Sequence, residues 1–167
     1  EKINNYSIMK LCVLVKQVPG SESALRIASS NTWIEETAAL FEMNESDNYA
    51  LEEALQIKEA LGNDPEVVVV SMGPERVQKV MREALAKGAD RGIHINEITE
   101  IKSDPFATSQ VFANVIKDEN FDLIFTGLQS DDVGSGQTGV ILGELLGMAT
   151  ATLVMATEVK DGSIRVK

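Results

Sequence analysis

The residues best suited to chemistry in this chain lie in the segment FDLIFTGLQSDDVGSGQTG, from Phe121 to Gly139. A short apolar run there leads into a polar loop of small residues, and Thr138 follows as the expected N-cap of a helix. Small residues with exposed backbone N–H groups ahead of a helix N-terminus favour the binding of a phosphate or another anion. The loop therefore indicates a nucleotide site, where Gly134 and Gly136 permit positive φ or a close backbone approach.

The glycines of this loop also match the dinucleotide fingerprint in letters, as Gly134-x-Gly136-x-x-Gly139. In that fingerprint the glycines directly follow the first strand of the fold. Here residues 128–133 separate the strand from the glycines, and too few residues follow for a second βαβ half. Glu158 does lie at a suitable distance for a ribose-binding acid, so a Rossmann NAD site stays an alternative, but the context favours a different nucleotide site.

Length and composition are typical of one soluble globular domain, with 167 residues, 44% apolar and 25% charged. The 15 basic and 26 acidic residues give a net charge of −11, which opposes binding to nucleic acid or to an anionic membrane surface. Cys12 is the single cysteine and lies in an apolar run, so we expect a buried core residue. A disulfide framework is excluded.

Targeting signals are weak in this sequence. No apolar stretch is long enough to span a bilayer, so direct membrane insertion is not expected. Residues 1–7 lack the basic and apolar regions of a secretory signal. We therefore interpret residues 1–8 as a leader and residues 9–167 as the nucleotide-binding domain, in a protein that is cytoplasmic or processed into a matrix-like compartment.

Apolar runs alternate with helical patterns along the chain, which predicts an α/β fold: an open, mostly parallel sheet with helices on both faces, in a single domain. Strands are expected at 11–15, 66–72, 92–95, 123–126 and 151–156. Helices are expected at about 47–61, 74–87, 103–116 and 138–147, the first capped by Ser46 or Asp47 and the third by Ser103 or Asp104. Residues 21–42 are expected to be irregular, with a hairpin around Ile27 and Trp33, and residues 161–162 form a tight turn to a returning strand at 164–167.

Ligands of open α/β sheets bind beyond the carboxyl ends of the strands. Those ends fall here at residues 14–16, at Met72 and Gly73, and at Gly127 with the loop after it. Residues 44–47, at the start of the first helix, are expected to close the same side. The pattern predicts a crevice of mononucleotide size.

Four colinear segments carry a resemblance that covers nearly the whole chain: MKLCVLVKQVP, YALEEALQIKE, VVVVSMGPERVQKVMREALAKGADRGIHI and DLIFTGLQSDDVGSGQTG. Together they resemble the β subunit of electron transfer flavoproteins. The resemblance implies an adenine nucleotide α-hydrolase-like (Rossmann-like) fold that binds AMP structurally. It also implies an α subunit as partner, which carries most contacts to the redox-active FAD, and an electron carrier that takes electrons from flavin dehydrogenases to a membrane quinone reductase or another acceptor.

The resemblance places the AMP contacts on Leu14, Asn44, Glu45, Ser46, Asp47, Met72, Gly127, Leu128, Gln129, Ser130, Asp131, Asp132, Val133, Gly134, Ser135, Gly136, Gln137 and Thr138. The run Gly136 to Gly139 resembles the AMP-binding form of the loop rather than the form of members that hold a second FAD. The chain departs from the family at Asn44-Glu45-Ser46, where many members have Asn-Pro-Phe or Asn-Pro-Tyr, so the turn lacks the fixed φ of proline. It also lacks the C-terminal arm that docks dehydrogenases, and looks like the nucleotide-binding core alone.

Several residues keep two interpretations. Asp131 and Asp132 are awkward next to an anionic nucleotide, which favours a ribose-hydroxyl or loop-shaping role. Lys16 either neutralises a phosphate or ends its strand. His94 has no acid or nucleophile partner in the pattern, which favours a buried or edge histidine over a catalytic one.

Two other function classes compete with the electron-carrier hypothesis. An ATP pyrophosphatase of the same fold requires a Ser-Gly-Gly-x-Asp-Ser type of loop after the first strand, and residues 16–20 read KQVPG instead. A stand-alone nucleotide-binding module resembling universal stress proteins places its glycine signature in the same final loop, so the sequence discriminates poorly against it. No catalytic constellation is visible, which favours a binding and electron-carrier role over an enzyme.

Overall fold

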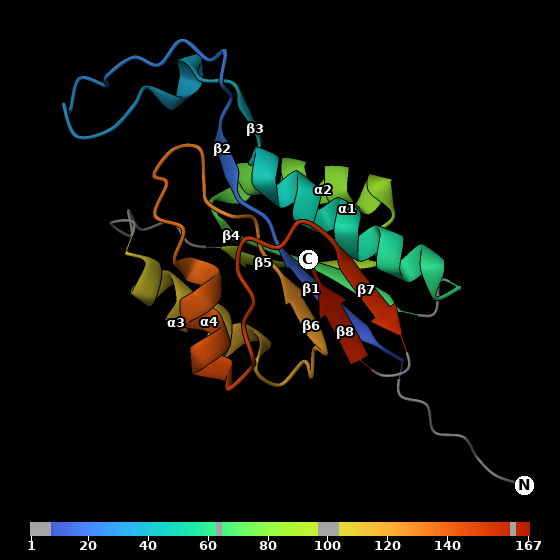
Figure 1. The fold of residues 1–167 in the computed structure, drawn as a ribbon. Helices are drawn as coiled ribbons and strands as arrows, with labels where there is room; N and C mark the ends of the chain where they lie inside the picture. Colours follow the sequence, from blue (N-terminus) through green and yellow to red (C-terminus); the bar gives the residue numbers. More distant parts are fainter. Residues whose placement is uncertain (1–7, 63–64, 97–103, 161–162) are drawn as a thin grey trace, which may run out of the picture.

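The computed structural model describes residues 8–62, 65–96, 104–160 and 163–167 (Figure 1). Within these residues the centre of the fold is a parallel sheet of four strands in the order β5-β4-β1-β6. The strands are β1 (Lys10–Leu14), β4 (Glu66–Gly73), β5 (Arg91–Asn96) and β6 (Leu123–Phe125). Across the sheet from β5 to β1, each strand comes earlier in the chain than its neighbour, whereas β6 comes last of the four. The strand order therefore reverses between β1 and β6. The predicted open parallel sheet is confirmed.

Two of the described helices cover each face of this sheet (Figure 1). They are α1 (Glu45–Ala60) and α2 (Gln78–Lys87) on one face, and α3 (Pro105–Ile116) and α4 (Thr138–Leu146) on the other. Alternate residues of β1 show the division, because Val13 packs in the cluster that includes Leu51 and Cys12 in the cluster that includes Phe112. Coverage on both faces explains why every residue from Val67 to Val70 is buried. Burial also raises the pKa of the Cys12 thiol to about 12, as expected for a core cysteine.

The helix starts differ in detail from the predictions. Helix α1 begins at Glu45 with Asn44 in the N-cap position, so neither Ser46 nor Asp47 caps it. Those two side chains instead accept or donate hydrogen bonds elsewhere, as described below. Helix α2 begins at Gln78, because a 3-10 turn, η2 (Glu75–Val77), lies between Pro74 and the helix.

The cap of α3 agrees with the sequence. The Asp104 carboxylate accepts a hydrogen bond of 2.9 Å from the backbone N–H of Phe106, and Pro105 occupies the first turn. Ser103, the other predicted cap, lies outside the described residues.

An arm projects from the sheet between β1 and α1 (Figure 1). Its base is an antiparallel pair, β2 (Gln17–Pro19) with β3 (Phe41–Met43), which was not predicted because three-residue strands show no periodicity. Beyond this pair lie the 3-10 helix η1 (Glu36–Ala38) and a single bridge between Ile27 and Ile34, close to where a hairpin was expected. Arg76 fastens the arm to the body, because its guanidinium lies 3.8 Å from the Phe41 ring centroid and donates to Glu36 at 3.2 Å.

The predicted strand at 151–156 is wrong. Residues 151–156 are irregular, and Leu153 has a φ of 56°, a left-handed conformation that interrupts an extended strand. The hairpin lies just beyond, as β7 (Thr157–Lys160) paired with β8 (Ser163–Val166) in a sheet of its own, and the predicted returning strand is confirmed. The turn at 161–162 is outside the described residues. The Glu53 carboxylate accepts a 2.6 Å bond from the Thr157 N–H and so anchors the hairpin to α1.

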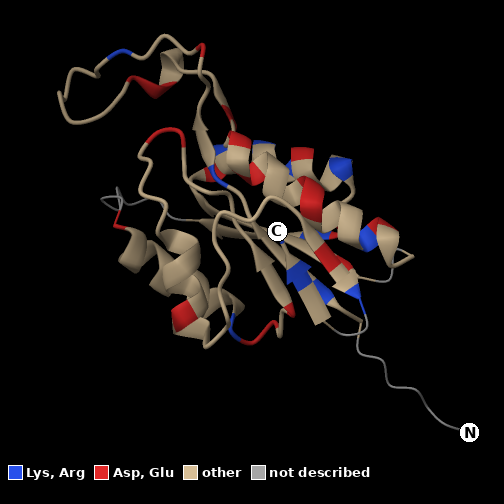
Figure 2. Cartoon of the chain, viewed as in Figure 1, with Lys and Arg blue, Asp and Glu red and all other residues tan. Residues whose placement is uncertain are grey.

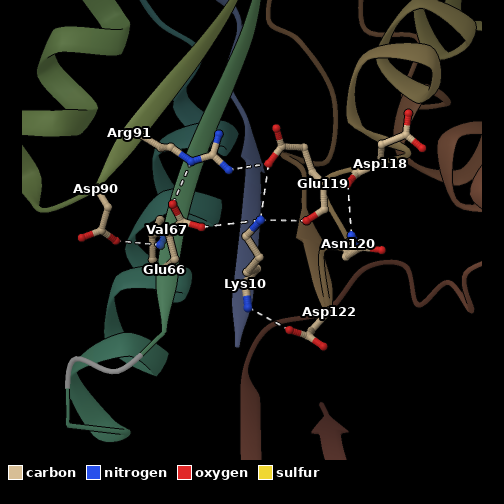
Figure 3. Close-up of polar contacts among 9 residues, drawn as sticks. All are labelled: Lys10, Glu66, Val67, Asp90, Arg91, Asp118, Glu119, Asn120 and Asp122. Carbon is tan, nitrogen blue, oxygen red and sulfur yellow. Dashed lines mark hydrogen bonds and ion pairs between the residues drawn. The ribbon is translucent and has the colours of Figure 1, made fainter. Parts of the chain in front are cut away.

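Charged side chains tie together the amino ends of the strands, at the edge opposite the predicted site (Figure 3). Lys10 lies 3.8 Å from Glu66 and 3.4 Å from Glu119, and Arg91 pairs with both carboxylates to close a ring of alternating charge. The hydrogen bond from Arg91 holds the pKa of Glu119 below its usual range. These contacts join the amino-end side of strands that are far apart in sequence.

Candidate functional site

The reversal of strand order places the candidate site at the carboxyl ends of β1 and β6. These strands pair up to Val13 and Phe125, after which their chains diverge to opposite faces of the sheet. The loop after β6, residues 127–137, lies against the first turn of α1 at this point. The structure thus brings together residues 44–47 and the glycine-containing loop, which are 80 or more positions apart in sequence.

Asp47 joins the two diverging strand ends. One carboxylate oxygen, Oδ2, accepts a 2.7 Å hydrogen bond from the backbone N–H of Lys16, and the other, Oδ1, accepts a 3.1 Å bond from the backbone N–H of Gly127. Burial raises the pKa of Asp47 to about 6, although the bonds from Lys16, Asn44 and Gly127 act in the opposite direction. A Cβ atom at Gly127 would lie 2.2 Å from Oδ1, so glycine is required there.

Asn44 and Ser46 fasten the next part of the loop to α1. The Asn44 side chain is 1% exposed; its Nδ2 donates to the Gln129 carbonyl at 2.9 Å, and its Oδ1 accepts from the Asp131 N–H at 2.9 Å. The Ser46 hydroxyl donates to the same Gln129 carbonyl at 2.7 Å. Side-chain bonds therefore hold residues 44–46 against the loop in a turn that has no proline. No sequence pattern indicates these pairings, because both partners are ordinary loop residues.

The two loop aspartates have loop-shaping contacts. The Asp132 carboxylate lies 2.6 Å from the Lys16 ammonium, which also donates to the Ser130 hydroxyl at 3.2 Å. Burial alone would raise the pKa of Asp132, but hydrogen bonds from Lys16 and Ser130 lower it below its usual range. Asp131 accepts a 3.3 Å bond from the Glu45 N–H. Lys16 therefore does more than end its strand, since its charge offsets a carboxylate beside the expected anion site.

The glycines shape the approach to α4. Gly134 and Gly136 have φ of 68° and 62°, which confirms the predicted positive φ, and the Gly134 N–H donates to the Ser130 carbonyl at 2.8 Å. Helix α4 begins at Thr138 as predicted, but Gln137 occupies the N-cap position, and its side chain makes no capping bond. The first-turn N–H groups of α4 therefore have no side-chain acceptor from their own cap, which leaves a helix N-terminus suited to an anion.

The remaining predicted residues divide by exposure. Leu14 is buried and Met72 partly buried, and both pack on the side of the sheet that α3 and α4 cover. The exposed residues of the loop include Leu128, Gln129, Val133, Ser135 and Gln137. Leu14 and Met72 thus form an apolar side of the candidate site, and the loop supplies accessible backbone groups.

Two features lie outside this site. A cavity of about 440 Å³ opens at the ends of β4 and β5, beside the arm, and is lined by Glu36, Pro74, Glu75, Arg76 and Asn96. Arg76 is the cation among the described residues of its lining, and it already binds Gln17 and Glu36. On β5, the His94 Nε2 lies 2.9 Å from the Gly73 carbonyl, a structural contact. Among the described residues no group of histidine, cysteine and acidic side chains is placed to hold a metal ion.

The fold and the site define an open α/β domain, with a loop suited to an anion at the point where the strand order reverses. Comparison with known proteins gives the family. The model of the electron transfer flavoprotein domain matches residues 32–167. The chain is 37% identical to the electron transfer flavoprotein subunit beta of Methylophilus methylotrophus over 154 residues, which are 92% of this chain and 58% of the relative. The chain is 37% identical to the subunit beta of Bradyrhizobium diazoefficiens over 158 residues, which are 95% of this chain and 62% of the relative. It is 36% identical to the subunit beta of Bacillus subtilis over 152 residues, which are 90% of this chain and 58% of the relative.

The chain therefore belongs to the electron transfer flavoprotein family, and its named relatives are beta subunits. It spans about three fifths of the length of these relatives, from 58% to 62%.

Proposed function

We propose that this chain is the nucleotide-binding part of an electron transfer flavoprotein β subunit. In this role it binds AMP structurally and supports an FAD-carrying α subunit, which takes electrons from flavin dehydrogenases. The observation that carries the proposal is the loop of residues 127–138 at the reversal between β1 and β6, in a chain of this family. The chain acts as a subunit of an electron carrier, and no catalytic role is assigned to it.

The residues present fit the phosphate of AMP. The N-terminus of α4 carries no side-chain cap, and Gly134 and Gly136 let the backbone turn tightly in front of it. The nearby carboxylates are engaged: Lys16 pairs with Asp132 and offsets its charge, and Asp131 accepts a hydrogen bond from the first turn of α1. AMP is favoured over a second FAD by the form of residues 136–139, and its phosphate would accept hydrogen bonds from the first-turn N–H groups of α4.

The arm supports the proposal of a partner subunit. Its apolar side chains have little of the body to pack on, and Leu25, Ile27, Trp33 and Leu40 are each more than half exposed. Exposed apolar residues gathered on a projecting element are typical of protein interfaces. The α1 surface is different, because it is rich in charged residues, most of them acidic (Figure 2). Among the described residues no helix is long and apolar enough to cross a membrane.

Substitution of an arm residue tests the partner. Ile27→Lys places a charge on a side chain that is 75% exposed and is expected to abolish stoichiometric co-purification of the α subunit with the tagged protein. Tyr49→Lys is the matched control, because Tyr49 is 67% exposed on the charged helix α1 and the same change there should leave co-purification intact. Equal recovery of the partner with both variants would exclude the arm from the interface. Failure of the unmodified protein to recover any flavoprotein subunit would contradict the heterodimer itself.

A further inference from the structure

Beyond their paired parts, β1 and β6 no longer bond to each other, although β1 still pairs with β4 at Leu14 and the Val15 N–H donates to the Val70 carbonyl at 2.9 Å. The two strands pair with each other only from Leu11 to Val13 and from Leu123 to Phe125. After that, the N–H groups of Lys16 and Gly127 need acceptors, because a buried backbone donor without one is costly. A single side chain, Asp47 from the first turn of α1, accepts from both.

The contacts of Asp47 leave little of its carboxylate for a ligand. Each oxygen already accepts a backbone hydrogen bond, and the side chain is buried. Gly127 approaches so closely that any Cβ atom would collide with Oδ1, so the geometry of the loop and of the carboxylate depend on each other. Ser46 and Asn44 continue the same attachment to Gln129.

We propose that Asp47 is a positioning residue, whose carboxylate holds the start of the 127–137 loop against the chain that follows β1. Nucleotide affinity depends on this pair of hydrogen bonds, the Asp47 brace, although Asp47 does not contact the ligand. This inference rests on the proposed nucleotide function. It gives Asp47 a role different from that of the glycines, which shape the backbone in front of α4.

The ionisation of Asp47 provides a signature that a purely structural residue would lack. An ionised carboxylate accepts two N–H bonds, whereas the protonated form loses one acceptor position. Its pKa of about 6 therefore predicts that the brace weakens as the pH falls through that value. The charged groups around it are Lys16, two residues beyond β1, Asp131 and Asp132 on the loop, and Glu45 on its own helix.

Protonation of Asp47 changes the stability of the fold in the opposite direction to its effect on the attachment of the loop. Because the folded-state pKa, about 6, lies above the ordinary value of 3.8, the folded chain binds this proton more tightly than the unfolded chain. Protonation of Asp47 therefore stabilises the fold as the pH falls through this window. A loss of nucleotide affinity on acidification is then separable from acid unfolding.

The test compares AMP affinity of the purified protein and of Asp47→Asn by calorimetric titration across pH. The amide keeps the shape but supplies one acceptor, so at about pH 8 the variant should bind AMP about tenfold more weakly. The ratio of affinities should fall toward one at about pH 5, where the native carboxylate is itself protonated. Because the phosphate of AMP also titrates near pH 6, the ratio and not the raw affinity is the measured quantity.

Two further variants separate the brace from general stability. Asp90→Asn removes a carboxylate that accepts from the Val67 N–H at 2.7 Å at the opposite edge of the sheet, and should lower the melting temperature with no change in AMP affinity (Figure 3). Ser46→Ala removes one bond to Gln129 and should weaken AMP binding about threefold at every pH.

Hydrogen exchange reports on the brace without nucleotide. Exchange of the amides of Lys16 and Gly127 should be faster in Asp47→Asn and unchanged in Asp90→Asn. A pH-independent affinity ratio, or native exchange in Asp47→Asn, would overturn the brace while leaving the nucleotide function standing. If the native protein binds no AMP, the proposed function fails, and the exchange comparison still decides whether Asp47 holds the loop.

Discussion

Gly136→Val is expected to abolish AMP binding while the fold survives. Gly136 has a φ of 62°, which a β-branched residue adopts only at a cost of about 1–2 kcal/mol, and a Cβ atom there would lie 3.4 Å from the Leu128 carbonyl. Valine would therefore both displace the loop and cover the backbone in front of α4. Calorimetric titration with AMP and thermal melts without ligand measure the two effects separately.

Gly147→Val is the matched control for this substitution. Gly147 follows α4 with a φ of 67°, and a Cβ atom there would have no other atom within 4 Å, so valine imposes similar backbone strain without touching the loop. This variant should lose a similar amount of stability and keep native AMP affinity. Native affinity in Gly136→Val would mean that the loop is only a connector and that the ligand site lies elsewhere.

Gly127→Ala is expected to produce the largest loss of stability among the loop variants, about 2–4 kcal/mol, together with loss of AMP binding. A Cβ atom would lie 2.2 Å from Asp47 Oδ1, 2.4 Å from the Ser46 hydroxyl and 2.8 Å from the Asp47 backbone nitrogen. The last of these belongs to the first turn of α1, so rotation of a side chain cannot relieve the collision. Chemical denaturation gives the stability change directly.

Gly20→Ala provides the comparison for Gly127→Ala. Its Cβ atom would meet only the end of the Glu42 side chain, at 3.0 Å, and that flexible carboxylate is able to move. The change in stability should stay within about 1 kcal/mol. Equal stability of Gly20→Ala and Gly127→Ala would show that α1 and the loop are not in the close contact on which the site depends.

The central sheet could be predicted from the sequence because the signal there is local. Val67 to Val70 form a continuous apolar run, which is expected only where helices cover both faces of a strand, and all four are buried. The same kind of signal failed at residues 151–156, where an apolar run that resembles a strand turns at Leu153. Among the described residues its backbone bonds to another segment are confined to Met155 and Ala156, which pair with Lys167. Strand formation depends on a partner, which no local pattern contains.

The shape of the loop in the candidate site could be predicted from the sequence, but its hydrogen bonds to α1 could not. Glycine spacing and the polar character of the loop predicted positive φ at Gly134 and Gly136, and the structure confirms it. The attachment of the loop to α1 by Asn44 and Asp47 joins residues 80 or more positions apart, and no periodicity reports such a contact. Thr138 illustrates the same limit, since its role as first helical residue rather than N-cap depends on backbone angles at Gln137.

Identification of the bound nucleotide tests the central proposal most directly. The purified protein is denatured, the released small molecules are separated, and their masses and amounts are compared with the amount of chain. The expected result is AMP at one molecule per chain, from a preparation in which any yellow flavin accompanies the α subunit and is absent from the isolated chain. Stoichiometric FAD released from the isolated chain, or no nucleotide together with no binding of added AMP, would contradict an AMP site in the loop between β6 and α4.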